Sequence, residues 1–186
     1  MNSLKTTAIA AAIVAGSALG ANAATVLYAT DATIVTDGPR GTNNDRDNIA
    51  NALGSEVGDL FELGYGAVVD FTFGRLFTGP GHVLEVTFSV PPKWLESVQV
   101  QAGRKGVFTD VATISNAEAQ FEPGARFDLS GAYDTLRLID TSPVRENSPT
   151  GGFDVDYVSV AAVPLPAAGM MLLGALGGLA LFRRRG

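Results

Sequence analysis

Two aspartates near the end of the chain, Asp154 and Asp156, have a spacing that could support chemistry. They are two residues apart in a run that alternates like a β-strand, so both side chains project from one face while Phe153, Val155 and Tyr157 project from the other. Two carboxylates held on one face repel each other unless water or a cation lies between them. A bound hard cation and a solvated polar face are the two interpretations.

An early polar loop offers further oxygen ligands for such a cation. Asp45, Asp47 and Asn48 lie in this loop, and Glu85 and Asp140 could contribute from neighbouring strands. Oxygen-rich sets of this kind suit calcium. The loop lacks the regular DxDxDG spacing of a dedicated calcium loop, so the alternative is that its side chains form Asx-turns. Structural Ca²⁺ is the one cofactor that these residues suggest.

Other catalytic arrangements find little support. The sequence has no cysteine, a single histidine (His82) and no GxSxG turn, which argues against nucleophilic catalysis and against zinc. A glycoside hydrolase would need two carboxyl groups in different environments, and nothing in the sequence marks one as lying in a pocket. We expect no enzymatic activity, with glycoside hydrolysis as the alternative.

Aromatic side chains could instead bind sugar rings. We expect Tyr65 and Trp94, with Phe77 and His82 beside them, to form an aromatic platform at the loop end of the domain. Sugar rings stack on aromatic faces, which makes glycan binding chemically reasonable; the alternative is that Trp94 packs over a sheet edge. Charged contacts to a ligand would come from Arg104, Lys105 and Arg145.

Short strands must position these residues. No helical period of 3.6 residues occurs between the two apolar ends of the chain, and segment 31–48 is a turn-rich polar loop. Segment 49–54 is a single turn. Short alternating runs at this spacing predict an all-β fold, an antiparallel β-sandwich. The expected strands are 25–30, 67–73, 82–90, 97–102, 107–114, 126–129, 135–140 and 153–160.

A series of short motifs is similar to bacterial galactose-binding-like, discoidin-type jelly rolls. The motifs are NALG at 51–54, FELGYGAVVDFTF at 61–73, LRLID at 136–140 and GFDVDYV at 152–158. The resemblance implies a jelly roll, often with a structural calcium between an early loop and the last strand. PPKW at 91–94 departs from the usual turn of that group. The name describes a fold and does not by itself imply a galactose site.

The first 23 residues have the form of a cleavable signal peptide. Lys5 precedes an apolar run, and Ala21-Asn22-Ala23 is a small-x-small cleavage site. An N-terminal membrane helix is the alternative, and it fits less well because Gly16 and Gly20 interrupt the stretch. We expect export through the Sec machinery and signal peptidase, leaving a β-sandwich domain over residues 24–162.

The C-terminal segment 163–186 combines a short motif, an uncharged apolar run over 168–182 and a basic end. Because arginines stay on the cytoplasmic side, the preceding domain would lie outside. The order of parts resembles the PEP-CTERM class of bacterial sorting signals, in its VPLPA variant, which implies cleavage by an exosortase-type protease; an ordinary membrane anchor is the alternative. The motif residues are Val163, Pro164, Leu165, Pro166 and Ala167, and the basic cluster is Arg183, Arg184 and Arg185.

Composition limits the partners. The chain of 186 residues has a formal net charge of −6 and no basic patch, so nucleic acid is not an expected partner. Without cysteine, packing must supply the stability. We expect a protein that is anchored transiently by its C-terminus and then reaches the cell surface or the extracellular space. Its expected role is structural or adhesive within exopolysaccharide or biofilm; the alternative is a carbohydrate-binding module.

Overall fold

The computed structural model describes residues 25–56, 58–86, 95–116, 125–145, 147–148 and 150–163. They lie within one unit, Thr25–Val163. The predicted signal peptide, Trp94 and the sorting segment beyond Val163 lie outside the described residues. Within the described part of the chain, no helix has the length and apolar character needed to cross a membrane.

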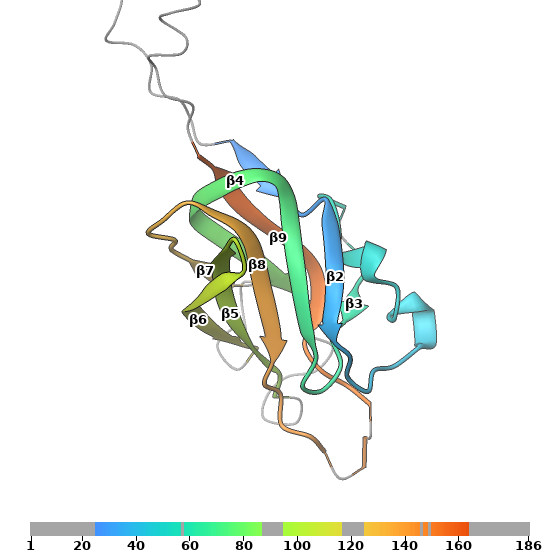
Figure 1. The fold of residues 1–186 in the computed structure, drawn as a ribbon. Helices are drawn as coiled ribbons and strands as arrows, with labels where there is room; N and C mark the ends of the chain where they lie inside the picture. Colours follow the sequence, from blue (N-terminus) through green and yellow to red (C-terminus); the bar gives the residue numbers. More distant parts are fainter. Residues whose placement is uncertain are drawn as a thin grey trace, which may run out of the picture. The chain divides into compact units, whose positions relative to one another are not determined.

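The described residues form nine strands and two short 3₁₀ helices, and the strand pairings among them are all antiparallel (Figure 1). This confirms the predicted antiparallel all-β class. The strands are β1 (Val26–Tyr28), β2 (Asp31–Thr36), β3 (Phe61–Glu62), β4 (Val68–Glu85), β5 (Ser97–Arg104), β6 (Val107–Ser115), β7 (Ala125–Phe127), β8 (Tyr133–Asp140) and β9 (Asp154–Ala162). The 3₁₀ helices are η1 (Asn43–Asp45) and η2 (Ile49–Ala52).

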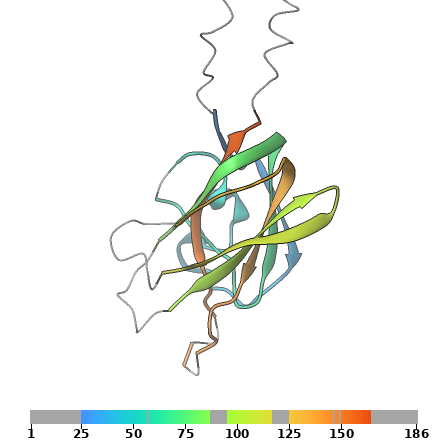
Figure 2. The ribbon, with the colours of Figure 1, turned by 90° about the vertical axis from the view of Figure 1, so that its left-hand side faces the viewer.

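Strand β4 takes part in both layers of the sandwich. Residues 68–72 pair with β2 and β8, and Phe77 makes one further pairing with β8. Residues 77–85 pair with β9, and residues 81–83 also pair with β7. The register shifts between these two parts, and Gly74 there has a φ of 69°, which favours glycine. One layer is therefore β2-β4-β8-β5-β6, and the other contains β1, β3, β9, β7 and the second part of β4. Figure 2 shows the β5–β6 hairpin crossing in front of the remaining strands.

The hydrophobic core comes from the inward faces of these strands. Phe71, Leu136 and Val100 are fully buried, as are residues of β9 such as Val155. Burying a side chain of this size stabilises the fold by about 1.5–3 kcal/mol. Phe77, predicted as part of the aromatic platform, is a core residue with no exposed surface and packs edge-on against Phe73. That prediction was wrong, because the bend in β4 turns Phe77 inward.

Two strand predictions need correction. Segment 31–48 was predicted as loop throughout, but β2 occupies Asp31–Thr36. Among the described strands it pairs only with β4, at the edge of the sheet. Most of its side chains are exposed, so it joins the sheet without burying an apolar face. The runs at 67–73 and 82–90 were predicted as separate strands, yet one strand, β4, joins them across 74–81. The predicted hairpin of β5 and β6 is confirmed.

Candidate functional site

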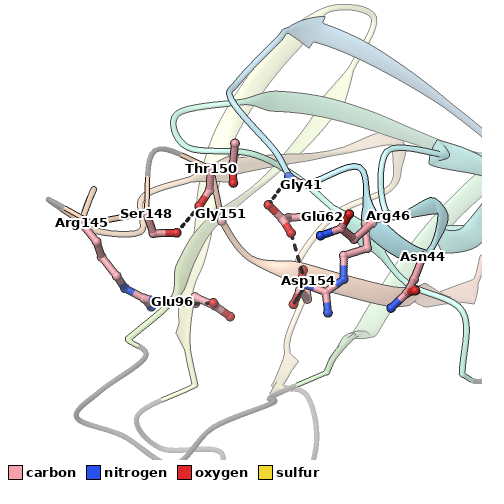
Figure 3. A pocket seen from close by; sticks show the side chains of 12 residues that line it. Gly41, Asn44, Arg46, Glu62, Glu96, Arg145, Ser148, Thr150, Gly151 and Asp154 are labelled. Carbon is pink, nitrogen blue, oxygen red and sulfur yellow. Dashed lines mark hydrogen bonds and ion pairs between the residues drawn. The ribbon is translucent and has the colours of Figure 1, made fainter.

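A polar pocket of about 400 Å³ lies at one end of the sandwich (Figure 3). Val26 pairs with Ala161, so the two ends of the described unit lie together at one end of β9, whereas Asp154 begins β9 at the other end. A volume of this size suits a small ligand. The lining is almost entirely polar: Asn43, Asn44, Arg46, Glu62, Glu96, Arg145, Ser148, Thr150 and Asp154, with Gly41, Gly151 and Gly152.

Strands β3 and β9 place two carboxyl groups side by side in this pocket. Glu62 and Asp154 are direct cross-strand partners, and both residues are buried, with 5% and 4% of their surface exposed. Side chains at such positions lie about 5 Å apart at their Cβ atoms, and like charges directly opposite destabilise a sheet. A positive group must therefore lie near this pair for both residues to ionise.

Arg46 supplies part of that positive charge. Its Nη1 lies 3.4 Å from Glu62 Oε2 and 3.9 Å from Asp154 Oδ2, and its own carbonyl accepts a hydrogen bond from the Glu62 amide. Glu62 also accepts a 2.7 Å hydrogen bond from the Gly41 amide. Asp154 is less fully hydrogen-bonded than Glu62, because its Oδ1 has no hydrogen-bond partner among the described residues.

A third carboxyl group, that of Glu96, also lines the pocket. Glu96 precedes β5, shares a side-chain hydrogen bond with Glu85, and lies 3.9 Å from Arg145. Burial raises the pKa of Glu96 to about 9, and the Asp154 and Glu85 carboxyls add to the rise. Burial also raises the pKa of Asp154 to about 7, with Glu62 adding to the rise and Arg46 opposing it. At neutral pH Glu96 therefore carries a proton.

Two glycines let the pocket wall pass close to the sheet. A Cβ on Gly152 would lie 2.7 Å from the Gly64 backbone nitrogen, and one on Gly151 would lie 2.6 Å from the Tyr65 hydroxyl. Both glycines have φ values near +150°, which disfavour other residues. Tyr65 thus lies behind the wall with 8% of its surface exposed. Its ring face is not open to a sugar.

Of the other residues predicted to contact a glycan, Arg145 lines the pocket. The His82 Nδ1 lies 3.3 Å from the Tyr157 hydroxyl on the neighbouring strand. Arg104 ends β5, and Lys105 lies in the turn before β6. The predicted aromatic platform therefore does not form from the described residues, and the polar groups of the pocket are the available contacts.

Asp140, predicted as a calcium ligand, has a structural role. Its two carboxylate oxygens accept hydrogen bonds from the amides of Gly66, Ser142 and Phe153 and from the Ser142 hydroxyl. These bonds tie the entry of β4 and the loop after β8 to the start of β9. Every donor in this clamp is a group of the chain itself, so the carboxylate needs no cation.

The remaining predicted calcium donors are divided among separate places. The Asp45 carboxylate accepts a hydrogen bond from the side-chain amide of Asn48, and the side chain of Asn48 caps the start of η2. Asp47 is exposed. Asp156, with 1% of its surface exposed, accepts a bond from the Gly58 amide. The described residues contain no group of three or more acidic or histidine side chains arranged to hold a metal. The seven donors do not form one shell, and calcium binding stays a prediction.

Burial corrects one other expectation. Asp154 and Asp156 were placed either at a cation or on a solvated face, and the solvated face is wrong because both residues are buried. Glu85, another predicted calcium ligand, is also buried, with 1% of its surface exposed. The sequence did not identify Glu62, because a carboxylate between two apolar residues of a strand is expected on the solvated face; only the structure shows that this residue is buried.

Comparisons with known proteins identify the fold. No protein-family model and no curated protein matches the sequence. Solved structures do match: the family 32 carbohydrate-binding module of AlyQ, in complex with 4,5-unsaturated mannuronic acid, has a TM-score of 0.52 at 11% identity, covering 73% of this chain and 97% of its own.

Two further solved structures are similar to this chain over most of their length. The family 32 module of NanJ from C. perfringens, in complex with galactose, has a TM-score of 0.52 at 11% identity, covering 74% of this chain and 99% of its own. A putative chitobiase fragment from Bacteroides thetaiotaomicron has a TM-score of 0.56 at 9% identity, covering 79% of this chain and 98% of its own. At such identities the likeness concerns the fold alone: this chain has the β-sandwich fold that family 32 carbohydrate-binding modules share.

Proposed function

We propose that this chain is an exported, non-enzymatic carbohydrate-binding module whose glycan enters the pocket between Glu62 and Arg145. The observation that carries the proposal is the pocket itself. It presents guanidinium, amide and hydroxyl donors together with carboxyl acceptors, and the hydroxyls of a sugar need both. The fold supports the proposal, since modules with this fold hold galactose in NanJ and an unsaturated mannuronic acid in AlyQ.

The position of the pocket also fits a binding role better than a purely structural one. Val163, the first residue of the predicted sorting motif, lies at the end of β9 opposite Asp154. A chain held at its C-terminus would therefore present the pocket away from the point of attachment. A role in exopolysaccharide or biofilm material follows as adhesion through glycan binding.

Glycan binding is tested by calorimetric titration of the full chain with neutral, acidic and basic oligosaccharides. The variant Arg145→Ala removes a charged donor of the pocket, and a lost hydrogen bond to a charged group costs about 1.5–3 kcal/mol, or roughly ten- to hundredfold in affinity. Arg75→Ala, at an exposed position of β4 outside the pocket lining, is the matched control and leaves affinity unchanged. Absence of binding to every glycan class, or equal losses in both variants, would overturn the proposal.

Hydrolysis is the competing function, because the pocket contains carboxyl groups of different pKa, as acid and base catalysis requires. Incubating the bound oligosaccharide with the protein and separating the products decides between the two. We expect the oligosaccharide to remain intact. Turnover that is abolished by Glu96→Gln would make the chain a hydrolase instead.

Processing by signal peptidase and an exosortase-type protease is proposed from the sequence resemblance. The mass of the protein recovered from the producing cell tests it: we expect a product that begins after Ala23 and ends near Pro164. Replacing the VPLPA motif should leave the C-terminal segment attached and the protein in the membrane fraction. An unprocessed protein with the native motif would point to an ordinary anchor.

A further inference from the structure

The pocket has an excess of acidic over basic groups. Glu62, Glu96 and Asp154 line it together with Arg46 and Arg145, so three carboxyls face two guanidinium groups. The ion pairs are long, with nitrogen–oxygen distances of 3.4 to 3.9 Å. These distances exceed the roughly 2.7–2.9 Å of a charge-assisted hydrogen bond between a guanidinium group and a carboxylate.

Asp154 carries the strongest sign of a missing partner. Its side chain is 5% exposed, lines the pocket, and lies directly across the sheet from Glu62. Its Oδ1 finds no hydrogen bond within the described part of the chain. A buried acceptor without a donor is costly, and a second carboxylate opposite it increases the cost. A ligand with a positive charge and several hydrogen-bond donors would give Oδ1 a donor and would reduce the repulsion between the two carboxylates.

The shape and chemistry of the pocket restrict which ligand this is. A uronate would add another carboxylate beside the Glu62–Asp154 pair, and a neutral sugar would bring no positive charge to that pair. A bare metal ion requires oxygen ligands converging at short distances, and the described residues contain no such group of three. A volume of about 400 Å³ leaves space for a sugar ring around the cation.

We propose that this pocket recognises the ammonium group of an amino sugar, held between Asp154 and Glu62, so that the ligand is a glycan containing de-N-acetylated hexosamine. The inference rests on the proposed carbohydrate-binding function and specifies its ligand class. An ammonium supplies one positive charge and three hydrogen-bond donors. Arg46, Arg145 and the hydroxyls of Ser148 and Thr150 would then contact the ring oxygens.

The test compares two ligands that differ only at the recognised group. The full chain is titrated with glucosamine oligosaccharides and with N-acetylglucosamine oligosaccharides of the same length and linkage, at a pH where the amine is protonated. We expect the glucosamine series to bind about tenfold or more tightly, the effect of a charge-assisted hydrogen bond. Raising the salt concentration should weaken the binding, because ionic contacts are screened.

Substitutions locate the site. Asp154→Asn keeps the size of the side chain and removes its charge, and it should abolish most of the preference for the free amine. Asp110→Asn makes the same exchange on β6, where the carboxylate accepts a hydrogen bond from Gln101 outside the pocket, and should retain the preference. Circular dichroism of both variants checks folding. The comparison of the two ligands with the native chain is independent of either variant.

Two outcomes would overturn this inference and leave carbohydrate binding intact: equal affinity for the two oligosaccharides, or binding of galactosides or uronates only. Calcium bound in an Asp154-dependent manner without any glucosamine binding would also overturn it and identify a metal site. If no glycan of any class binds, the proposed function fails together with the inference. The galactoside and uronate titrations thus separate the two failures.

Discussion

Asp140 and Asp154 are equally buried, with 3% and 4% of their surface exposed, yet their surroundings differ. Asp140 receives four hydrogen bonds from the chain and holds three segments together. Asp154 faces another carboxylate across the sheet, lies 3.9 Å from its arginine, and keeps one oxygen without a partner among the described residues. Burial alone therefore does not distinguish a structural carboxylate from one available to a ligand; the number of satisfied oxygens does.

The largest effect expected from this comparison is on stability at Asp140. Asp140→Ala leaves the amides of Gly66, Ser142 and Phe153 without their acceptor, and each buried unsatisfied group costs about 1–3 kcal/mol. We expect the free energy of unfolding to fall by roughly 3 kcal/mol or more in urea titrations. A loss below about 1 kcal/mol would show that the clamp contributes little and would remove the contrast with Asp154.

The pH dependence of stability should come mainly from the pocket. The folded-state pKa of Glu96 is about 9 and that of Asp154 about 7, both above their ordinary values of 4.5 and 3.8. The folded state therefore holds more protons than the unfolded state, and stability falls as the pH rises through about 7 and then about 9.

Thermal unfolding between pH 5 and pH 9 in the absence of ligand measures this slope. In the variant Glu96→Gln, the loss of stability at the upper end of this pH range should disappear, because the glutamine amide does not ionise. The groups near Glu96 are Glu85, Asp154 and Arg145, and all three are kept in the variant. A slope identical to that of the native chain would mean that other groups set the pH dependence.

Asp154 should behave in the opposite way to Asp140. Asp154→Asn removes an incompletely paired charge, so we expect stability at pH 8 to be unchanged or to rise by about 1 kcal/mol, while ligand affinity falls. Urea titration at pH 8 beside Asp110→Asn measures the change. A loss of stability as large as that of Asp140→Ala would make Asp154 a structural residue.

Calcium should have the smallest effect. The predicted donors lie in separate places, so excess calcium and a chelator should give nearly the same thermal midpoint. A ligand at a hundredfold excess over its dissociation constant would stabilise the folded state by about 2.7 kcal/mol. A gain of that order, lost in the Asp154→Ala/Asp156→Ala double variant, would show that these donors bind a metal together.

Local patterns predicted much of the sheet. The alternation of apolar and polar residues was sufficient to predict β5, β6, β8 and β9, because the side chains of a strand alternate between its faces whatever its partner strand is. Edge strand β2 escaped prediction because it buries no apolar face and leaves no such alternation. The continuity of β4 across its glycine-containing bend was not predicted either, because glycine and proline usually indicate a turn or loop that ends a strand.

The sequence by itself determined the all-β class, most strand positions and the presence of paired acids on β9. Only the tertiary structure decided which acids meet. Glu62 faces Asp154 because β3 pairs with the start of β9, and Glu96 joins them because the loops around β5 and β8 close the same end. Such contacts depend on which strands pair with each other across long stretches of chain. The local alternation of residues decides which face of a strand is buried, but it does not decide which distant strand becomes its partner.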